Sequence, residues 1–174
     1  MTATPDWNVL QKKLDSLQRA TATFTICDDA DLRTRLGQAK AELAAAEARL
    51  KSLAEESADT TAGERRAERA RTELAAAQAA YDERAVTLTF QAMPREQLEA
   101  LERQHPATEE EEADGEEFHL DGFAPAVLSA ASTDGMPVEA AEKLMRNWSA
   151  ADFRALWSAA YGIQHQGRAD LGKG

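Results

Sequence analysis

The chain has 174 residues, of which 43% are hydrophobic and three are tryptophan, so it can bury a small core in one or two domains. Its formal net charge is −11, and residues 86–174 hold most of the excess, with 16 acidic against 7 basic side chains. Because such a surface repels phosphate, nucleic-acid binding is not expected. No apolar run approaches the roughly 20 residues that span a bilayer, so no membrane association is expected either.

The N-terminus and the cysteine content indicate a reducing compartment. The chain does not start with a basic region followed by an apolar one, so secretion is not expected. We expect a cytoplasmic location instead. The single cysteine, Cys27, cannot form an internal disulfide. Its place at the end of an apolar stretch favours a packed side chain over a nucleophile.

An N-terminal segment, residues 1–20, contains a short apolar periodicity. Trp7, Leu10, Leu14 and Leu17 are spaced three and four residues apart. This spacing predicts an amphipathic helix from about Asp6 to Arg19.

Two stretches with strict alternation, residues 23–27 and 86–90, bracket a long Ala/Leu/Glu/Arg segment. Their period of two predicts half-buried strands with one apolar face each, made of Phe24 and Ile26 in the first strand and of Val86, Leu88 and Phe90 in the second. A chain that leaves a sheet along one helix and returns along another brings the two strands together antiparallel.

The bracketed segment, about residues 30–84, has a heptad seam in each half. Asp28, Asp29 and Asp31 are cap candidates before it. The seam residues are Leu32, Leu36, Ala39, Leu43, Ala46, Leu50 and Leu53, and then Ala67, Ala70, Leu74, Ala77 and Tyr81. Turn and cap residues at 56–63 separate the halves, which favours an antiparallel hairpin. The alternative is one continuous helix in an intermolecular coiled coil.

Beyond the second strand the pattern is helical with one acidic interruption. A helix that begins at Pro94 and ends before His105 completes a domain at 21–105. Residues 106–120 form an acidic linker in which 109–117 hold seven carboxylates, too repulsive to pack, as a solvated tether or acidic surface. A helical unit follows at 121–166, with helices predicted at 123–131, 137–148 and 150–164. Residues 167–174 form a flexible tail.

The last predicted helix and the residue before its cap carry a wide aromatic face. It consists of Trp148, Phe153, Leu156, Trp157 and Tyr161. A face of this kind is usually domain core, and the alternative is a docking surface for a partner. The predicted fold is therefore α+β and mostly α: a small antiparallel strand pair with an inserted antiparallel helical hairpin, followed by a small helical C-terminal unit.

Residues typical of catalysis are scarce. His105, His119 and His165 lack the spacing of a metal pair, and no glycine-rich phosphate loop, nucleophile elbow or paired-cysteine motif occurs. No enzyme activity, cofactor or metal site is expected.

The order of these features resembles the tail assembly chaperones of long-tailed (siphovirus-type) actinobacteriophages. The resemblance runs from Thr21 to Gln164 and rests on a succession of short motifs, of which the clearest are TFTIC, VTLTF, PREQLEAL, FAPAVLSAA and WSAADFRALW. It implies a protein without catalytic residues that holds the tape measure protein soluble while the tail tube assembles. The implied partners are the tape measure protein and, as a second candidate, the tail tube protein.

The resemblance also implies a location in the host cytoplasm and absence from the mature virion. A homo-oligomer is compatible with it. The alternative is a phage structural or adaptor protein that uses the helical hairpin for protein-protein interaction or oligomerisation, and an enzyme is the least supported class.

Overall fold

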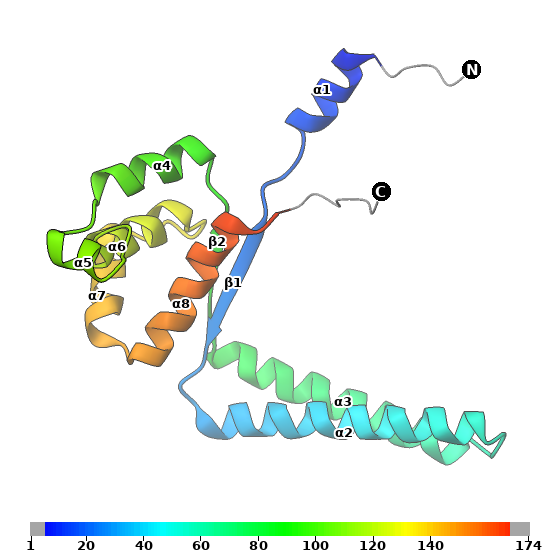
Figure 1. The fold of residues 1–174 in the computed structure, drawn as a ribbon. Helices are drawn as coiled ribbons and strands as arrows, with labels where there is room; N and C mark the ends of the chain where they lie inside the picture. The colour runs from blue at the N-terminus through cyan, green and yellow to red at the C-terminus, as the bar shows by residue number, and fades with distance from the viewer. Residues whose placement is uncertain (1–5, 168–174) are drawn as a thin grey trace. The chain divides into compact units, whose positions relative to one another are not determined.

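The computed structural model describes residues 6–167 and is mostly helical, with one two-stranded antiparallel sheet (Figure 1). This confirms the predicted α+β class. By its internal contacts the chain divides into Thr25–Thr87 and a second unit made of the residues on either side. The predicted tail at 167–174 lies outside the described residues except for Gly167.

The sheet pairs β1 (Thr21–Ile26) with β2 (Val86–Gln91). Its register is fixed by the Ala92 amide, which donates to the Ala20 carbonyl at 2.8 Å, and by the hydroxyls of Thr25 and Thr87, which are 2.9 Å apart. Phe24 and Phe90 are buried as predicted. The prediction is wrong for Val86, which is 56% exposed because it is the first residue of β2, where the sheet ends.

A short loop covers the outer edge of β2. The Thr133 amide donates to the Thr89 carbonyl at 2.9 Å, and the Thr89 amide donates to the Asp134 carboxylate at 2.7 Å. Ser132 also forms an antiparallel bridge with Phe90. Unpaired strand edges promote association with other strands, and this loop removes that template.

The inserted segment is an antiparallel hairpin of α2 (Ala30–Glu55) and α3 (Thr61–Arg84), which lie side by side in Figure 1. Asp29 caps α2, accepting from the amides of Asp31 and Leu32 at 3.0 Å. The predicted seam is confirmed by two clusters of buried and half-buried side chains. One holds Leu36, Ala39, Leu74, Ala77 and Tyr81, and the other Leu43, Ala46, Leu50, Ala67 and Ala70.

The turn of the hairpin closes with a left-handed residue. Ser57 has φ 54°, and the Ala58 amide donates to the Leu53 carbonyl at 3.0 Å, as at many helix C-termini. The break near residues 56–60 ends α2, so the structure contains the hairpin and not the continuous helix.

Helix α6 (Leu120–Ala131) is the centre of the second unit. It contacts α4 (Arg95–Gln104), α7 (Val138–Asn147) and α8 (Ala150–Gly162), and its Phe123, Val127 and Leu128 are completely buried. The unit division therefore differs from the predicted one, which grouped α4 with the hairpin. Helix α4 belongs with the C-terminal helices because its apolar face packs on α6.

Residues 106–120 are ordered locally and are not a featureless tether. Within them α5 (Glu109–Ala113) begins with a capping box: Thr108 accepts from the Glu111 amide at 3.3 Å, and Glu111 accepts from the Thr108 amide at 2.9 Å. An antiparallel bridge joins Pro106 and Phe118. The expectation of a tether was wrong for this reason, although Glu109, Glu110 and Glu112 do form a solvated acidic surface.

Candidate interaction surfaces

An aromatic cluster forms where α6 and α8 meet. Phe123 is completely buried, and its ring centroid lies 4.1 Å from that of Phe118 and 5.9 Å from those of Trp157 and Tyr161. Trp157 and Tyr161 are stacked, with centroids 4.6 Å apart and planes at 7°. Phe118, which follows the acidic segment, thereby anchors that segment to the helical unit.

The five residues predicted for docking have different surroundings. Leu156 is completely buried, so it belongs to the core, as the sequence favours for this face, and the alternative of a docking role is wrong for this residue. Trp148 is half-buried and packs on Phe24 of β1, with centroids 5.8 Å apart. Trp157 and Tyr161 are half-buried within the aromatic cluster.

Phe153 is the member of the predicted face with the fewest constraints. It is half-buried, and among residues 6–167 no other ring contacts it. Phe153 is therefore the predicted docking aromatic that no ring contact within these residues ties to the core.

Tyr161 is held at the edge of the core as a neutral phenol. Burial raises the pKa of its hydroxyl, and the carboxylates of Glu102 and Glu117 raise it further. In α5 the effect is opposite, because the Thr108 amide and then His119 lower the pKa of Glu111. The His119 Nδ1 lies 3.0 Å from a Glu111 carboxylate oxygen.

The N-terminal helix α1 (Trp7–Asp15) exposes a stripe of large apolar side chains. It is shorter than predicted, since Asp6 caps its start and Ser16 ends it, and none of its residues is buried. Trp7 is 63% exposed, Leu14 51% and Leu17, just beyond the helix, 57%. Periodicity revealed the amphipathic character of this segment, but only the structure shows that the apolar side is left exposed within residues 6–167.

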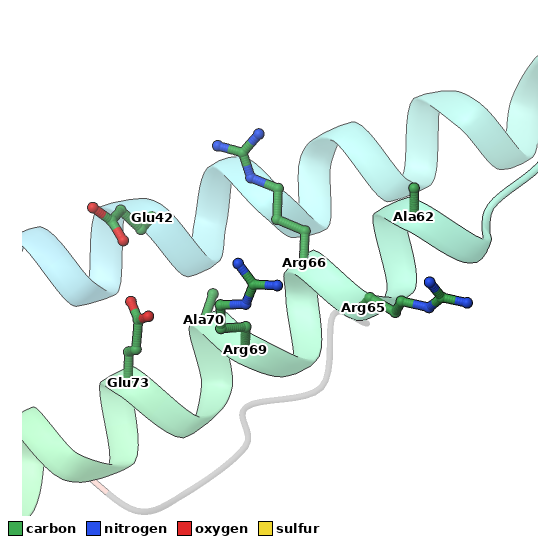
Figure 2. Close-up of a pocket in the computed structure, with 7 residues that line it drawn as sticks. All are labelled: Glu42, Ala62, Arg65, Arg66, Arg69, Ala70 and Glu73. Atoms are coloured by element: carbon green, nitrogen blue, oxygen red, sulfur yellow. The ribbon is translucent and has the colours of Figure 1, made fainter.

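One flank of the α2–α3 seam is a shallow groove of about 560 Å³ (Figure 2). It is lined by Ala62, Ala70, Glu42, Arg65, Arg66, Arg69 and Glu73. A second groove of about 330 Å³, lined by Arg35, Gln38, Ala39 and Ala77, shares Glu42 and Glu73 with it.

The two flanks of the α2–α3 seam differ in whether their charged side chains form ion pairs within the described residues. On the other flank Arg71 pairs with Glu47 across the helices at 2.9 Å. In the groove, Arg66, Arg69, Glu42 and Glu73 form no ion pair with any residue of the described part of the chain. Unpaired charges that line a groove are available to a partner.

Within residues 6–167 no group of three or more His, Cys, Asp or Glu side chains is arranged to hold a metal ion. In the same residues, none of the helices combines the length and the apolar character that crossing a bilayer requires. Comparison with protein-family models, with curated proteins and with solved structures finds no match to this chain.

Proposed function

We propose that this chain is a phage tail assembly chaperone that binds the tape measure protein and keeps it in solution while the tail tube forms. The observation that carries the proposal is the apolar stripe at residues 7–17, which α1 begins and in which Trp7, Leu14 and Leu17 are all more than half exposed. Four of the seven large hydrophobic side chains exposed in the described residues lie at positions 7–17. Contiguous exposed apolar surface is typical of an interaction site.

The chemistry of α1 suits a helical client. A short amphipathic helix can lay its apolar face along another apolar helix, with Trp7 as an anchor of large contact area. The net charge of −11 then keeps the complex from coalescing with other copies. Each contact is small, so a long client needs several chaperone copies, each of which can leave as the tube subunits take its place.

The order of sequence motifs from Thr21 to Gln164 supports the same function. It resembles that of tail assembly chaperones of siphovirus-type actinobacteriophages. On this proposal the protein acts in the host cytoplasm without catalysis, contacts the tape measure protein and the tail tube protein, and is absent from the mature virion.

Co-expression with a phage tape measure protein tests the proposal. The wild-type chain should raise the soluble fraction of that protein. A variant with Trp7→Ser, Leu14→Ser and Leu17→Ser should lose this effect and keep its melting temperature, because none of the three side chains is buried.

A matched control variant carries Val86→Ser, Leu120→Ser and Val138→Ser, which alters the exposed large hydrophobic residues of the described chain that lie outside positions 7–17. It should hold the client in solution as well as the wild type. If both variants lose the ability to keep the client in solution, that ability depends on general surface hydrophobicity and not on residues 7–17. If the client stays insoluble with the wild-type chain, the chaperone function is refuted. Phe153→Ala, measured in the same assay, tests the predicted surface on α8.

The alternative function is a permanent structural or adaptor module of the particle. It is favoured by the hairpin, whose groove carries charges without partners in the described residues. The two functions separate in purified virions, because an adaptor stays in fixed stoichiometry and a chaperone is missing.

A further inference from the structure

On the groove face of the hairpin, each helix carries a pair of acidic and basic side chains. A second copy of this face, turned end to end, therefore presents the opposite charge at each position of these pairs. On α2, Glu42 and Arg49 are seven residues apart and therefore lie two turns apart on one side of the helix. On α3, Arg66 and Glu73 have the same separation. All four residues are exposed, and none forms an ion pair within the described residues.

The midpoints of these two pairs lie at the same height along the hairpin. The midpoint between Glu42 and Arg49 falls at Ala45 and Ala46, and that between Arg66 and Glu73 falls at Arg69 and Ala70. Ala46 and Ala70 belong to one packed cluster, so the two helices are in register there. In Figure 2 the two carboxylates of Glu42 and Glu73 accordingly lie on one side of this level, with Arg66 on the other.

We propose that two copies of this chain associate through this groove face, hairpin against hairpin, in an antiparallel four-helix arrangement. The two-fold axis crosses the hairpin from α2 to α3 at the level of Ala46 and Ala70. This operation lays α2 on α2 and α3 on α3 in reverse direction. It brings Glu42 of one copy against Arg49 of the other, and Arg66 against Glu73.

The charges also select the antiparallel arrangement over the parallel one. In a parallel pair, the two-fold axis runs along the hairpins, both hairpins point in the same direction, and α2 of one copy lies on α3 of the other. Glu42 then meets Glu73, and Arg49 meets Arg66, so every contact is between like charges. In the antiparallel pair each of the four charged residues faces a residue of opposite charge. Arg69 also comes within one helical turn of the Glu73 of the other copy.

Two further features suit a second copy as the occupant. The apolar residues that line the groove are the alanines Ala62 and Ala70, whose small side chains let helices approach closely. Arg35 and Glu56 lie at equal distances on either side of the α2 midpoint and extend the same pattern. On the opposite flank the Glu47–Arg71 pair already satisfies its charges within one copy.

The test is the mass of the full chain in solution, measured by sedimentation over a dilution series without any client. The wild type should reach twice the 18.9 kDa of one chain, with a dissociation constant that rises as added salt screens the charges. A variant with Glu42→Arg and Glu73→Arg and one with Arg49→Glu and Arg66→Glu should each remain at single-chain mass. An equimolar mixture of the two variants should recover the doubled mass.

A control variant with Lys40→Glu and Lys51→Glu changes the net charge as much as the second variant but alters other positions of α2, and it should dimerise like the wild type. Circular dichroism verifies that each variant is folded. A wild type that stays at single-chain mass, or reversed variants that still dimerise alone, would overturn the proposal. Because no client is present, either outcome leaves the proposed chaperone function untouched.

Discussion

Gly122 lies where α6 passes closest to the imidazole of His105. A Cβ placed at Gly122 would be 2.6 Å from the His105 Nδ1, closer than side chains tolerate. Gly37 in α2 offers the contrast, since a Cβ there meets no atom within 4 Å. The two glycines therefore occupy helices for different reasons, close packing at Gly122 and no packing requirement at Gly37.

Gly122→Ala should destabilise the chain by about 1 to 3 kcal/mol, because the added methyl group displaces the His105 ring from its contact with Phe123. The matched substitution Gly37→Ala should stabilise it by about 0.5 to 1 kcal/mol, through helix propensity alone. Chemical denaturation measures both. Adding His105→Ala should relieve the Gly122→Ala defect, and a stabilising Gly122→Ala on its own would contradict the close contact.

Local sequence rules work at the residue scale when all the partners lie within one turn. Asp29 and Ser149 cap their helices as such rules predict, and the capping box of Thr108 and Glu111 was readable in the same way. The many carboxylates around this capping box predict repulsion and so conceal it in the sequence. Local rules favour the core for the face that contains Leu156, but they do not tell which of its residues are completely buried, since that depends on neighbours from other elements.

The hairpin is the element whose stability should depend most on its own seam. Leu43 is half-buried in the cluster with Ala46 and Ala67, and the neighbouring Ala44 is exposed. Leu43→Asp places a charge in that cluster and should destabilise the hairpin by about 2 to 4 kcal/mol. Ala44→Asp should cost only about 0.5 kcal/mol of helix propensity.

Hydrogen exchange resolved by segment measures this difference. Leu43→Asp should speed exchange in residues 30–84 and leave α6 and α8 protected, because the hairpin is a compact unit of its own. Equal loss of protection in α6 would show that the two units unfold together.

The heptad seam was predictable because both partners show the same pattern: the apolar positions of α2 from Leu36 to Leu50 pack against apolar positions of α3. The aromatic face of α8 carries no such information. Phe153 and Trp157 belong to one stripe in the sequence, yet of these two only Trp157 has ring partners in the part of the chain that the structure describes, and they come from α6 and from α8 itself.

At the scale of the whole molecule, charge and stability are separable in the acidic segment. Glu109, Glu110 and Glu112 are exposed and form no ion pair in the described residues, whereas Glu111 supports the α5 cap and His119. Replacing the first three by Gln should change the melting temperature by less than about 2 °C and lower the solubility limit. Glu111→Ala removes one negative charge, as a single Glu→Gln substitution does, but it should lower the melting temperature.

Scanning calorimetry and precipitation by ammonium sulfate measure these two properties separately. A large loss of stability in the triple variant would mean that the exposed carboxylates are structural. The sequence could predict where this acidic segment lies, but not that Phe118 fastens its end to Phe123, because that contact joins different elements.

The hairpin begins and ends on adjacent strands, and this constrains how its length can change during evolution. An insertion in α2 alone would shift its alanines past those of α3, whereas seven residues added to each arm move the turn outward by about 10 Å and keep every layer aligned. Lengths should therefore change in paired heptads, with the strands and the helical unit unaltered. The arm is in effect an adjustable spacer, whose reach can be selected independently of the domain that carries it.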